Sequence, residues 1–398
     1  MFSSLKLKAF RIYWLGMFIS LIGTWIQIVA QSWLVFQLTK SEFLLGLVGF
    51  LTHIPVFFLS LFGGVMADRA NRKVILMVTQ VSFMLMAFVL AFLTQRGLIT
   101  PLQIMFIAVL NGIIMAFDAP SRQAVVVNLV DKKNLLNAIA LNSVAFNSSR
   151  IIGPVLAGIL VAVIGMSGCF YVNAFSFTAM IIALALIQIN GNPLNNKNHG
   201  PLKDLCEGLS AVKNNRQILI LMSMVAVSSL FGIPYIILMP VFADNILKVG
   251  ISGLGYLMSF SGVGAVVGAL ILAGLGDFKF KGKLLGISMV IFAFSLILLS
   301  LSRNYAFSFI SLAFIGASSV TAVSLINTIL QGIVTDEIRG RVMSVFMFTF
   351  AGFMPFGNLL AGSLAQVFGV SQALLINGII CAIFFLSLNL FYPKIKNL

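Results

Sequence analysis

One arginine stands in the middle of an otherwise uncharged apolar segment. Arg150 is the only charged residue within 137–165, and it shares a helical face with Ser143, Asn147 and Pro154. An arginine at the centre of a bilayer costs at least ~2.5 kcal/mol, so its side chain has to face protein or water. Because a guanidinium group suits carboxylate and catecholate oxygens, Arg150 is a candidate contact for an anionic or carbonyl-rich substrate. A structural role, with its donors on backbone carbonyls and Asn147, is the alternative.

Four other apolar segments carry polar residues at helical spacing. Side chains three, four and seven positions apart lie on one face of a helix, and we interpret these faces as the lining of a water-filled pathway. Interhelical hydrogen bonding is the alternative, because polar side chains commonly bridge helices in membranes. In chain order, the candidate residues are Ser20, Thr24, Gln27 and Gln31; Asn111, Asp118 and Arg122; Ser228 and Tyr235; and Thr321, Ser324, Thr328 and Gln331.

Two titratable residues are candidates for carrying a proton. His53 lies inside an apolar segment, two residues before Pro55, and an imidazole changes charge near neutral pH. A histidine satisfied within the packed core is the alternative for this position. Asp118 is the second candidate, although it lies towards the end of its apolar segment.

The composition identifies the elements that have to position these residues. The chain of 398 residues is 60% hydrophobic and 9% charged, whereas soluble domains are roughly 25% charged. Apolar runs of about 20 residues, enough to cross a bilayer as a helix, recur throughout. We therefore expect an all-α membrane protein with twelve transmembrane helices. The expected spans are 10–38, 43–66, 74–95, 101–122, 137–165, 168–190, 217–243, 252–276, 283–302, 305–332, 341–368 and 371–392.

Basic residues are distributed unequally between the two ends of these spans. Twenty of the 25 Lys and Arg residues fall on one side, and the four on the other side are Lys40, Arg96, Lys248 and Arg303. This is the positive-inside pattern, so we expect both termini in the cytoplasm. The net charge of +15 then orients the protein in the membrane and attracts anionic lipid headgroups. We expect no nucleic-acid partner.

The sequence lacks the patterns of enzymes and of metal or nucleotide sites. Its three cysteines and two histidines have no metal-ligand spacing. The segment Gly276–Leu285 resembles a phosphate loop only superficially, because Asp277 stands where the first glycine is required and Leu284 replaces the Ser or Thr. We expect no catalysis, no cofactor and no metal, and a protein that uses an existing gradient.

Two parts of the chain resemble each other at a constant offset. Segments 151–165 and 355–369 match at seven of fifteen positions when aligned 204 residues apart. The same offset relates Asn173 to Asn377. We interpret this as duplication, which is typical of transporters built from parallel repeats.

The most polar internal segment, Asn190–Gln217, follows the sixth expected span and divides the chain. We therefore expect an N-terminal six-helix half at 1–190, a cytoplasmic linker at 191–216 and a C-terminal six-helix half at 217–398. Together with the duplication, this predicts two pseudo-symmetric halves.

The loop between the second and third spans carries a specific motif. The stretch "GGVMADRANRKVIL", Gly63 to Leu76, closely resembles the signature loop of the major facilitator superfamily. Asn71 replaces the second glycine of that pattern, and we expect it to adopt the left-handed turn that glycine would take. Three further stretches, "AFDAPSRQAVV", "AIALNSVAFNSSRIIGP" and "NAFSF", resemble the branch that contains enterobactin exporters and macrolide efflux proteins. The positions that match the signature loop are Gly64, Asp68, Arg69 and Arg72.

The resemblance implies a mechanism of alternating access between two halves. It places Asp68 where it would accept N–H groups at the start of a facing helix and so latch one conformation, with Arg72 and Asp118 as a charge relay. The alternative is that these charges only anchor the loop at the membrane surface. The stretch "IIGPVLAG" resembles the antiporter motif of exporters, in which the matching residues are Gly153, Pro154 and Gly158.

These observations favour a secondary active transporter in the bacterial inner membrane. We expect a monomer that exports a small organic molecule, such as a siderophore or a drug, by proton antiport. A lipid or lysophospholipid flippase of the same fold is the alternative.

Overall fold

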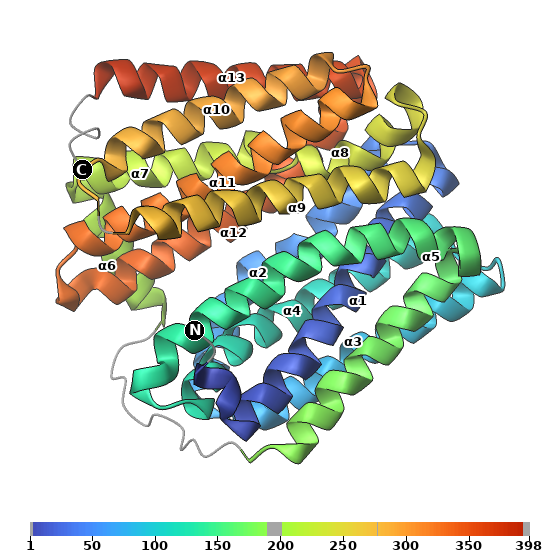
Figure 1. Ribbon diagram of the computed structural model, residues 1–398, viewed down its shortest axis with the longest axis horizontal. Helices are drawn as coiled ribbons and strands as arrows, with labels where there is room; N and C mark the ends of the chain where they lie inside the picture. The colour runs from blue at the N-terminus through green and yellow to red at the C-terminus, as the bar shows by residue number, and fades with distance from the viewer. Residues whose placement is uncertain (1–2, 189–200, 277, 393–398) are drawn as a thin grey trace. The chain divides into compact units, whose positions relative to one another are not determined.

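The computed structural model describes residues 3–188, 201–276 and 278–392, and this part of the chain consists of helices and turns without strands (Figure 1). Eleven of its helical stretches are long and apolar enough to cross a membrane. One of them, α5 (Leu135–Leu186), is 52 residues long and contains two of the expected spans. The prediction of an all-α, multi-pass membrane protein with twelve spans is therefore confirmed.

A left-handed glycine marks the same position in each repeat. Gly165, at φ 73° and ψ 177°, interrupts α5 between the fifth and sixth expected spans. Gly369, at φ 85°, separates α12 (Asp336–Phe368) from α13 (Val370–Phe391). Glycine takes these angles without the steric cost that a Cβ atom would bring. The offset of 204 residues found in the sequence thus relates two identical breaks in the backbone.

The N-terminal unit comprises Met1–Thr39 and Leu51–Pro201. Within it, α5 packs against both α1 and α3. Phe10, Tyr13 and Leu76 are fully buried in its core, as expected for a helical bundle whose inner faces exclude lipid. Its elements are η1 (Ser3–Lys6), α1 (Lys8–Thr39), most of α2 (Glu42–Arg69), α3 (Arg72–Gln95), α4 (Pro101–Leu129), η2 (Lys132–Asn134) and α5.

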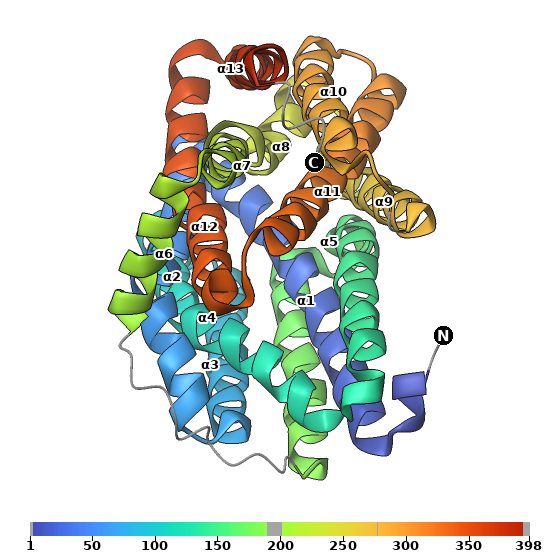
Figure 2. The ribbon, with the colours of Figure 1, turned by 90° about the vertical axis from the view of Figure 1, so that its left-hand side faces the viewer.

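The C-terminal unit comprises Lys40–Phe50 and Leu202–Leu398. Gly264 and Gly268 of α9 lie so close to Ala313 and Ala317 of α11 that a Cβ atom on either glycine would collide with the backbone there. Small residues at this spacing permit close helix packing in membranes. Figure 2 shows α9 and α11 obliquely within this unit. The elements are α6 (Pro201–Asn214), α7 (Arg216–Val227), η3 (Ser228–Gly232), α8 (Tyr235–Val241), η4 (Phe242–Ile246), α9 (Gly250–Leu275), α10 (Lys281–Leu301), α11 (Tyr305–Ile333), α12 and α13.

The seventh expected span is not a continuous α-helix. Two π-helical segments, η3 and η4, flank the short helix α8. Pro234 precedes α8 and Pro240 lies inside it, and proline removes the N–H group that an α-helix needs. Single π-helical turns are frequent at functional sites. The prolines were visible in the sequence, but the apolar run alone predicted an unbroken span.

Two segments lie near the boundaries of the expected halves. The first residues of α2 group with the C-terminal unit, where the Ser41 hydroxyl donates to the side-chain oxygen of Gln366 on α12 at 2.8 Å. In the expected linker, residues 189–200 lie outside the described part of the chain. Residues 201–214 form α6, which is joined to α12 by an ion pair of 2.7 Å between Glu207 and Arg341.

Candidate functional site

Arg150 lies on α5, about 15 residues or ~22 Å from the start of that helix at Leu135. Its side chain is half-buried, and it has an interaction partner within the protein. One turn earlier, the amide of Asn147 donates to the backbone oxygen of Ser143 at 2.8 Å. The N–H donor of the Asn147 amide is therefore engaged within its own helix turn.

The helix that carries Arg150 is fixed against α1 just beyond the arginine. A Cβ atom on Gly153 would collide with Trp25 of α1, and Pro154 and Gly158 are buried. Gly153, the first residue of the antiporter-like motif, thus lies at a close contact between α5 and α1. A rigid contact at this point holds the backbone beneath Arg150 in place.

A chain of amide groups connects α1 to the second part of α5. Asn173 donates to the side-chain oxygen of Gln27 at 2.7 Å, and Gln27 donates to that of Gln31 at 3.3 Å. The hydroxyl of Ser176 completes the chain by donating to the Asn173 side-chain oxygen at 3.1 Å. Gln27 is only 9% exposed, so the polar face of α1 bridges two helices at Gln27 and is more open at the half-buried Gln31.

Asn173 was missed as a site residue in the sequence, where it appeared only in the repeat offset and in the stretch "NAFSF". It and its counterpart Asn377 are each 2% exposed. Buried amides at matching positions of two repeats were a usable signal, because a polar side chain buried among membrane helices needs a partner.

Asp118 lies at the centre of a buried polar cluster formed by α3 and α4. One carboxylate oxygen accepts from Thr79 and from Gln80, both at 2.7 Å. The other accepts from the guanidinium group of Arg122, four residues along α4. The hydroxyl of Tyr13 on α1 is 3.5 Å from the Arg122 backbone oxygen. With Asp118 only 6% exposed, the cluster fixes α3, α4 and α1 to one another inside the apolar unit.

One expectation about these charges is wrong. The relay between Arg72 and Asp118 is replaced by other contacts. Arg72 donates to the backbone oxygen of Ala67 at 2.8 Å and to the side chain of Asn128. The i, i+4 spacing places Arg122 beside Asp118, so the nearer guanidinium group satisfies the carboxylate.

The signature loop is short and is ordered by a helix cap. Asn71 has φ −68° and accepts from the backbone N–H groups of Lys73 and Val74, so the expected left-handed turn at Asn71 is wrong. An asparagine at this position caps the first turn of α3 instead. The ammonium group of Lys73 donates to the backbone oxygen of Ile187 at 2.7 Å, which satisfies a carbonyl at the end of α5.

The other residues of the proposed latch, Gly64, Asp68 and Arg69, lie at the C-terminal end of α2. The backbone of Asp68 is helical, but its side chain lies outside the described structure, and Arg69 is exposed at the last position of the helix. A Cβ atom on Gly64 would meet no atom within 4 Å, whereas one on Gly63 would collide with the backbone of Ala116 on α4. Of these two glycines, Gly63 is the one at the close contact between α2 and α4.

His53 and Asn111 flank a contact between α2 and α4. Both are half-buried. Gly112 lies so close to the backbone oxygen of Thr52 that a Cβ atom there would collide with it. The structure thus brings these two predicted residues to the same helix pair, although their spacing in the sequence gave no reason to connect them.

Tyr235 is buried in the C-terminal unit. It is 4% exposed, and its hydroxyl group lies 2.7 Å from that of Ser261 on α9. Helical spacing placed Tyr235 on a pathway face, while the observed contact is the interhelical hydrogen bond of the alternative reading. The break in the seventh span next to Tyr235 turns this part of the chain towards α9.

Thr328 and Gln331 remain accessible on α11, and both are exposed. The hydroxyl of Thr328 donates to the backbone oxygen of Ser324 at 2.9 Å, and the amide of Gln331 donates to the side chain of Asn327. These bonds stay within one helix. Both side chains are therefore accessible on the surface of α11.

The chain is similar to known membrane transporters along almost all of its length. The family described as transmembrane secretion effector matches residues 1–397. The staphyloferrin A transporter of Staphylococcus aureus is 29% identical over 366 residues, covering 91% of both chains. Macrolide efflux protein A of Streptococcus pyogenes is 24% identical over 96% of this chain and 95% of that protein. The enterobactin exporter of Shigella boydii is 26% identical over 84% and 80%.

Solved structures of other transporters share the fold. A bacterial homologue of the human lysosomal transporter Spinster superposes with a TM-score of 0.77 at 14% identity, covering 98% of both chains. A nucleoside transporter gives the same TM-score at 14% identity, covering 96% of this chain and all of that one. At such low identity, the likeness concerns the fold alone.

Proposed function

This chain belongs to the transmembrane secretion effector family within the major facilitator superfamily, and from that premise we propose that it exports a small organic anion. It is a multi-pass membrane transporter and not an enzyme. The proposed negative charge of the substrate rests on Arg150, a half-buried cation in the middle of the part of α5 that precedes the break at Gly165. A guanidinium group at this depth provides paired donors for carboxylate or catecholate oxygens.

Siderophores and drugs are the substrate classes that the relatives favour. Three of these relatives are named for staphyloferrin A, a macrolide and enterobactin. Between these classes, Arg150 favours a siderophore-like anion. The flippase alternative gains no support from these names.

Coupling to protons by alternating access is the second part of the proposal. His53 on α2 and Asp118 on α4 are the titratable residues that we propose for the coupling, and both lie in the N-terminal unit. Asp118 already accepts three hydrogen bonds, whereas His53 is half-buried beside a helix contact. We further propose that the protein is a monomer in the bacterial inner membrane.

The experiment that tests export compares cells with and without the protein. Cells that lack it should accumulate the candidate anion, and expression of the wild-type chain should restore the lower level. Equal accumulation in both strains for siderophore-like anions and for macrolides would exclude these two substrate classes.

Both termini and the segment joining the units should lie in the cytoplasm. Twenty Lys and Arg residues map to that side, against four on the other, so the positive-inside rule gives this orientation. Reporter fusions at residue 1, within 191–200 and at residue 398 should all report a cytoplasmic location. An external C-terminus would mean that the number of spans is wrong.

Asp68→Asn should slow export sharply without impairing folding or membrane insertion. We propose that the Asp68 carboxylate accepts N–H groups at a helix start and stabilises one closed state, a contact that an amide makes more weakly because it lacks the charge. Transport rate and membrane level are the measurements. Asp131→Asn is a matched control, since Asp131 is exposed and makes no capping hydrogen bond. A wild-type rate in Asp68→Asn would remove the latch from the mechanism.

A further inference from the structure

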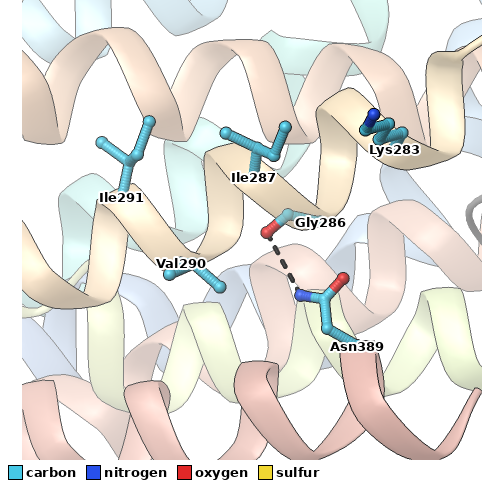
Figure 3. A pocket seen from close by; sticks show the side chains of 6 residues that line it. All are labelled: Lys283, Gly286, Ile287, Val290, Ile291 and Asn389. Atoms are coloured by element: carbon cyan, nitrogen blue, oxygen red, sulfur yellow. Dashed lines mark hydrogen bonds between the residues drawn. The ribbon is translucent and has the colours of Figure 1, made fainter.

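A shallow groove of about 300 Å³ runs between α10 and α13 of the C-terminal unit (Figure 3). It contains none of the residues that we assign to transport. Its wall is mainly apolar, and none of the lining residues is acidic. They are Lys283, Gly286, Ile287, Val290 and Ile291 on α10, and Asn389 on α13.

The groove exists because a glycine faces an asparagine. The amide of Asn389 donates to the backbone oxygen of Gly286 at 3.3 Å and to that of Phe385 at 3.0 Å. A Cβ atom at Gly286 would collide with the Asn389 side-chain oxygen. The two helices therefore touch through this amide, and the apolar lining residues Ile287, Val290 and Ile291 all lie on the α10 side of the groove. Because both N–H groups of Asn389 are used, the amide is a fixed floor of the groove.

The apolar wall is open to the surroundings. Ile287 is 47% exposed and Ile291 is 39% exposed, and both point to the same side of α10 in Figure 3. On the surface of a membrane-spanning helix, such side chains meet lipid acyl chains. A groove lined in this way accommodates an extended hydrocarbon chain.

Positive charge gathers at one end of the groove. Lys283 is exposed on the first turn of α10, and Lys279 and Lys281 come just before it in the sequence. Phe280, the N-cap residue, gives the first turn no side-chain hydrogen bond, and a helix start favours anions. Asn389 lies on the last turn of α13, so the basic end of the groove is at the ends of both helices, where a membrane surface begins.

We propose that this groove binds a phospholipid with an anionic headgroup, such as phosphatidylglycerol. The phosphate group lies at Lys283, and one acyl chain lies along Ile287, Val290 and Ile291. Basic pockets between transmembrane helices near a membrane surface recognise anionic headgroups in this way. The site is separate from the transport pathway, so it holds whether or not the proposed substrate is correct.

The charge of Lys283 is tested on the purified full-length protein by native mass spectrometry. Phosphatidylglycerol and phosphatidylcholine with identical acyl chains are the probes. Phosphatidylglycerol should be retained more strongly, and Lys283→Gln should weaken its binding about five-fold, since one lysine near a membrane surface contributes about 1 kcal/mol. Lys213→Gln removes the same charge from the exposed surface of α6 and should leave the binding unchanged. Equal retention of both lipids, or equal losses in both variants, would overturn the proposal.

The apolar wall is tested separately by filling the groove. Ile291→Trp should weaken the binding of phosphatidylglycerol several-fold, because the larger side chain occupies the position of the acyl chain. Phe294→Trp is the control, because Phe294 is 47% exposed on the same helix but does not line the groove. If both tryptophan variants retain the lipid like the wild type, the acyl chain does not occupy this groove.

Discussion

Replacing Arg150 with lysine or with glutamine should leave the protein folded and inserted while native substrate binding is lost. Glutamine removes the charge, and lysine keeps the charge but loses the planar pair of donors that matches a carboxylate. Hydrogen bonds to charged groups contribute about 1.5–3 kcal/mol, which corresponds to a loss of affinity of roughly ten-fold to more than a hundred-fold. Equilibrium binding of the candidate anion to the purified variants measures this loss.

A matched control separates the effect of Arg150 from a general loss of positive charge. Arg96 is exposed just after the end of α3 in the same unit, so Arg96→Gln should bind substrate like the wild type. Normal binding by either Arg150 variant would show that Arg150 has a structural role. Failure of both variants to fold would show the same. In either case the cargo would not need to be anionic.

Asp118→Asn should destabilise the N-terminal unit severely. The substitution keeps a polar side chain next to Thr79 and Gln80 but leaves the guanidinium group of Arg122, whose side chain is only 17% exposed, without its counter-charge. Breaking a buried ion pair from one side costs about 3–5 kcal/mol in proteins. We expect a large decrease in the thermal unfolding temperature of the purified variant.

The double variant Asp118→Asn with Arg122→Gln should recover much of that stability. It removes both charges, so neither remains buried alone, and the interaction free energy between the two sites should be strongly non-additive. Two atoms of the cluster, Nη1 of Arg122 and Oε1 of Gln80, already lack a hydrogen-bond partner among the described residues, so its polar groups are not fully satisfied. Strict additivity of the two single effects would show that the two charges do not stabilise each other within α4.

The sequence predicted the spans and the duplication because both follow from local patterns. Apolar length determines which segments can cross a bilayer, and the repeat offset depended on identities that survive at turns such as Gly165 and Gly369. The break before Tyr235 was not predicted, since hydropathy does not register the prolines that cause it. The family resemblance was specific because it rested on short contiguous motifs, which are also local patterns.

The candidate site was predicted less completely because partners come from other helices. Helical spacing correctly placed Gln27 and Gln31 on one face, but it could not show that Asn173 of α5 bridges to that face. The relay expected between Arg72 and Asp118 was wrong because Arg122 is nearer in three dimensions. Asn71 was expected to imitate glycine, while its side chain caps α3 instead. In each case the missing information was the neighbour that competes for a polar group.

Transport by the purified protein in liposomes tests the central claim, export of a small organic anion driven by a proton gradient, most directly. With a pH gradient across the membrane, the wild type should move a labelled siderophore-like anion against its concentration gradient, and a protonophore should stop that movement. Arg150→Lys should give the flux of empty liposomes, while Arg96→Gln should match the wild type. A wild-type flux that is the same with and without the pH gradient, or no flux of any such anion, would contradict the account.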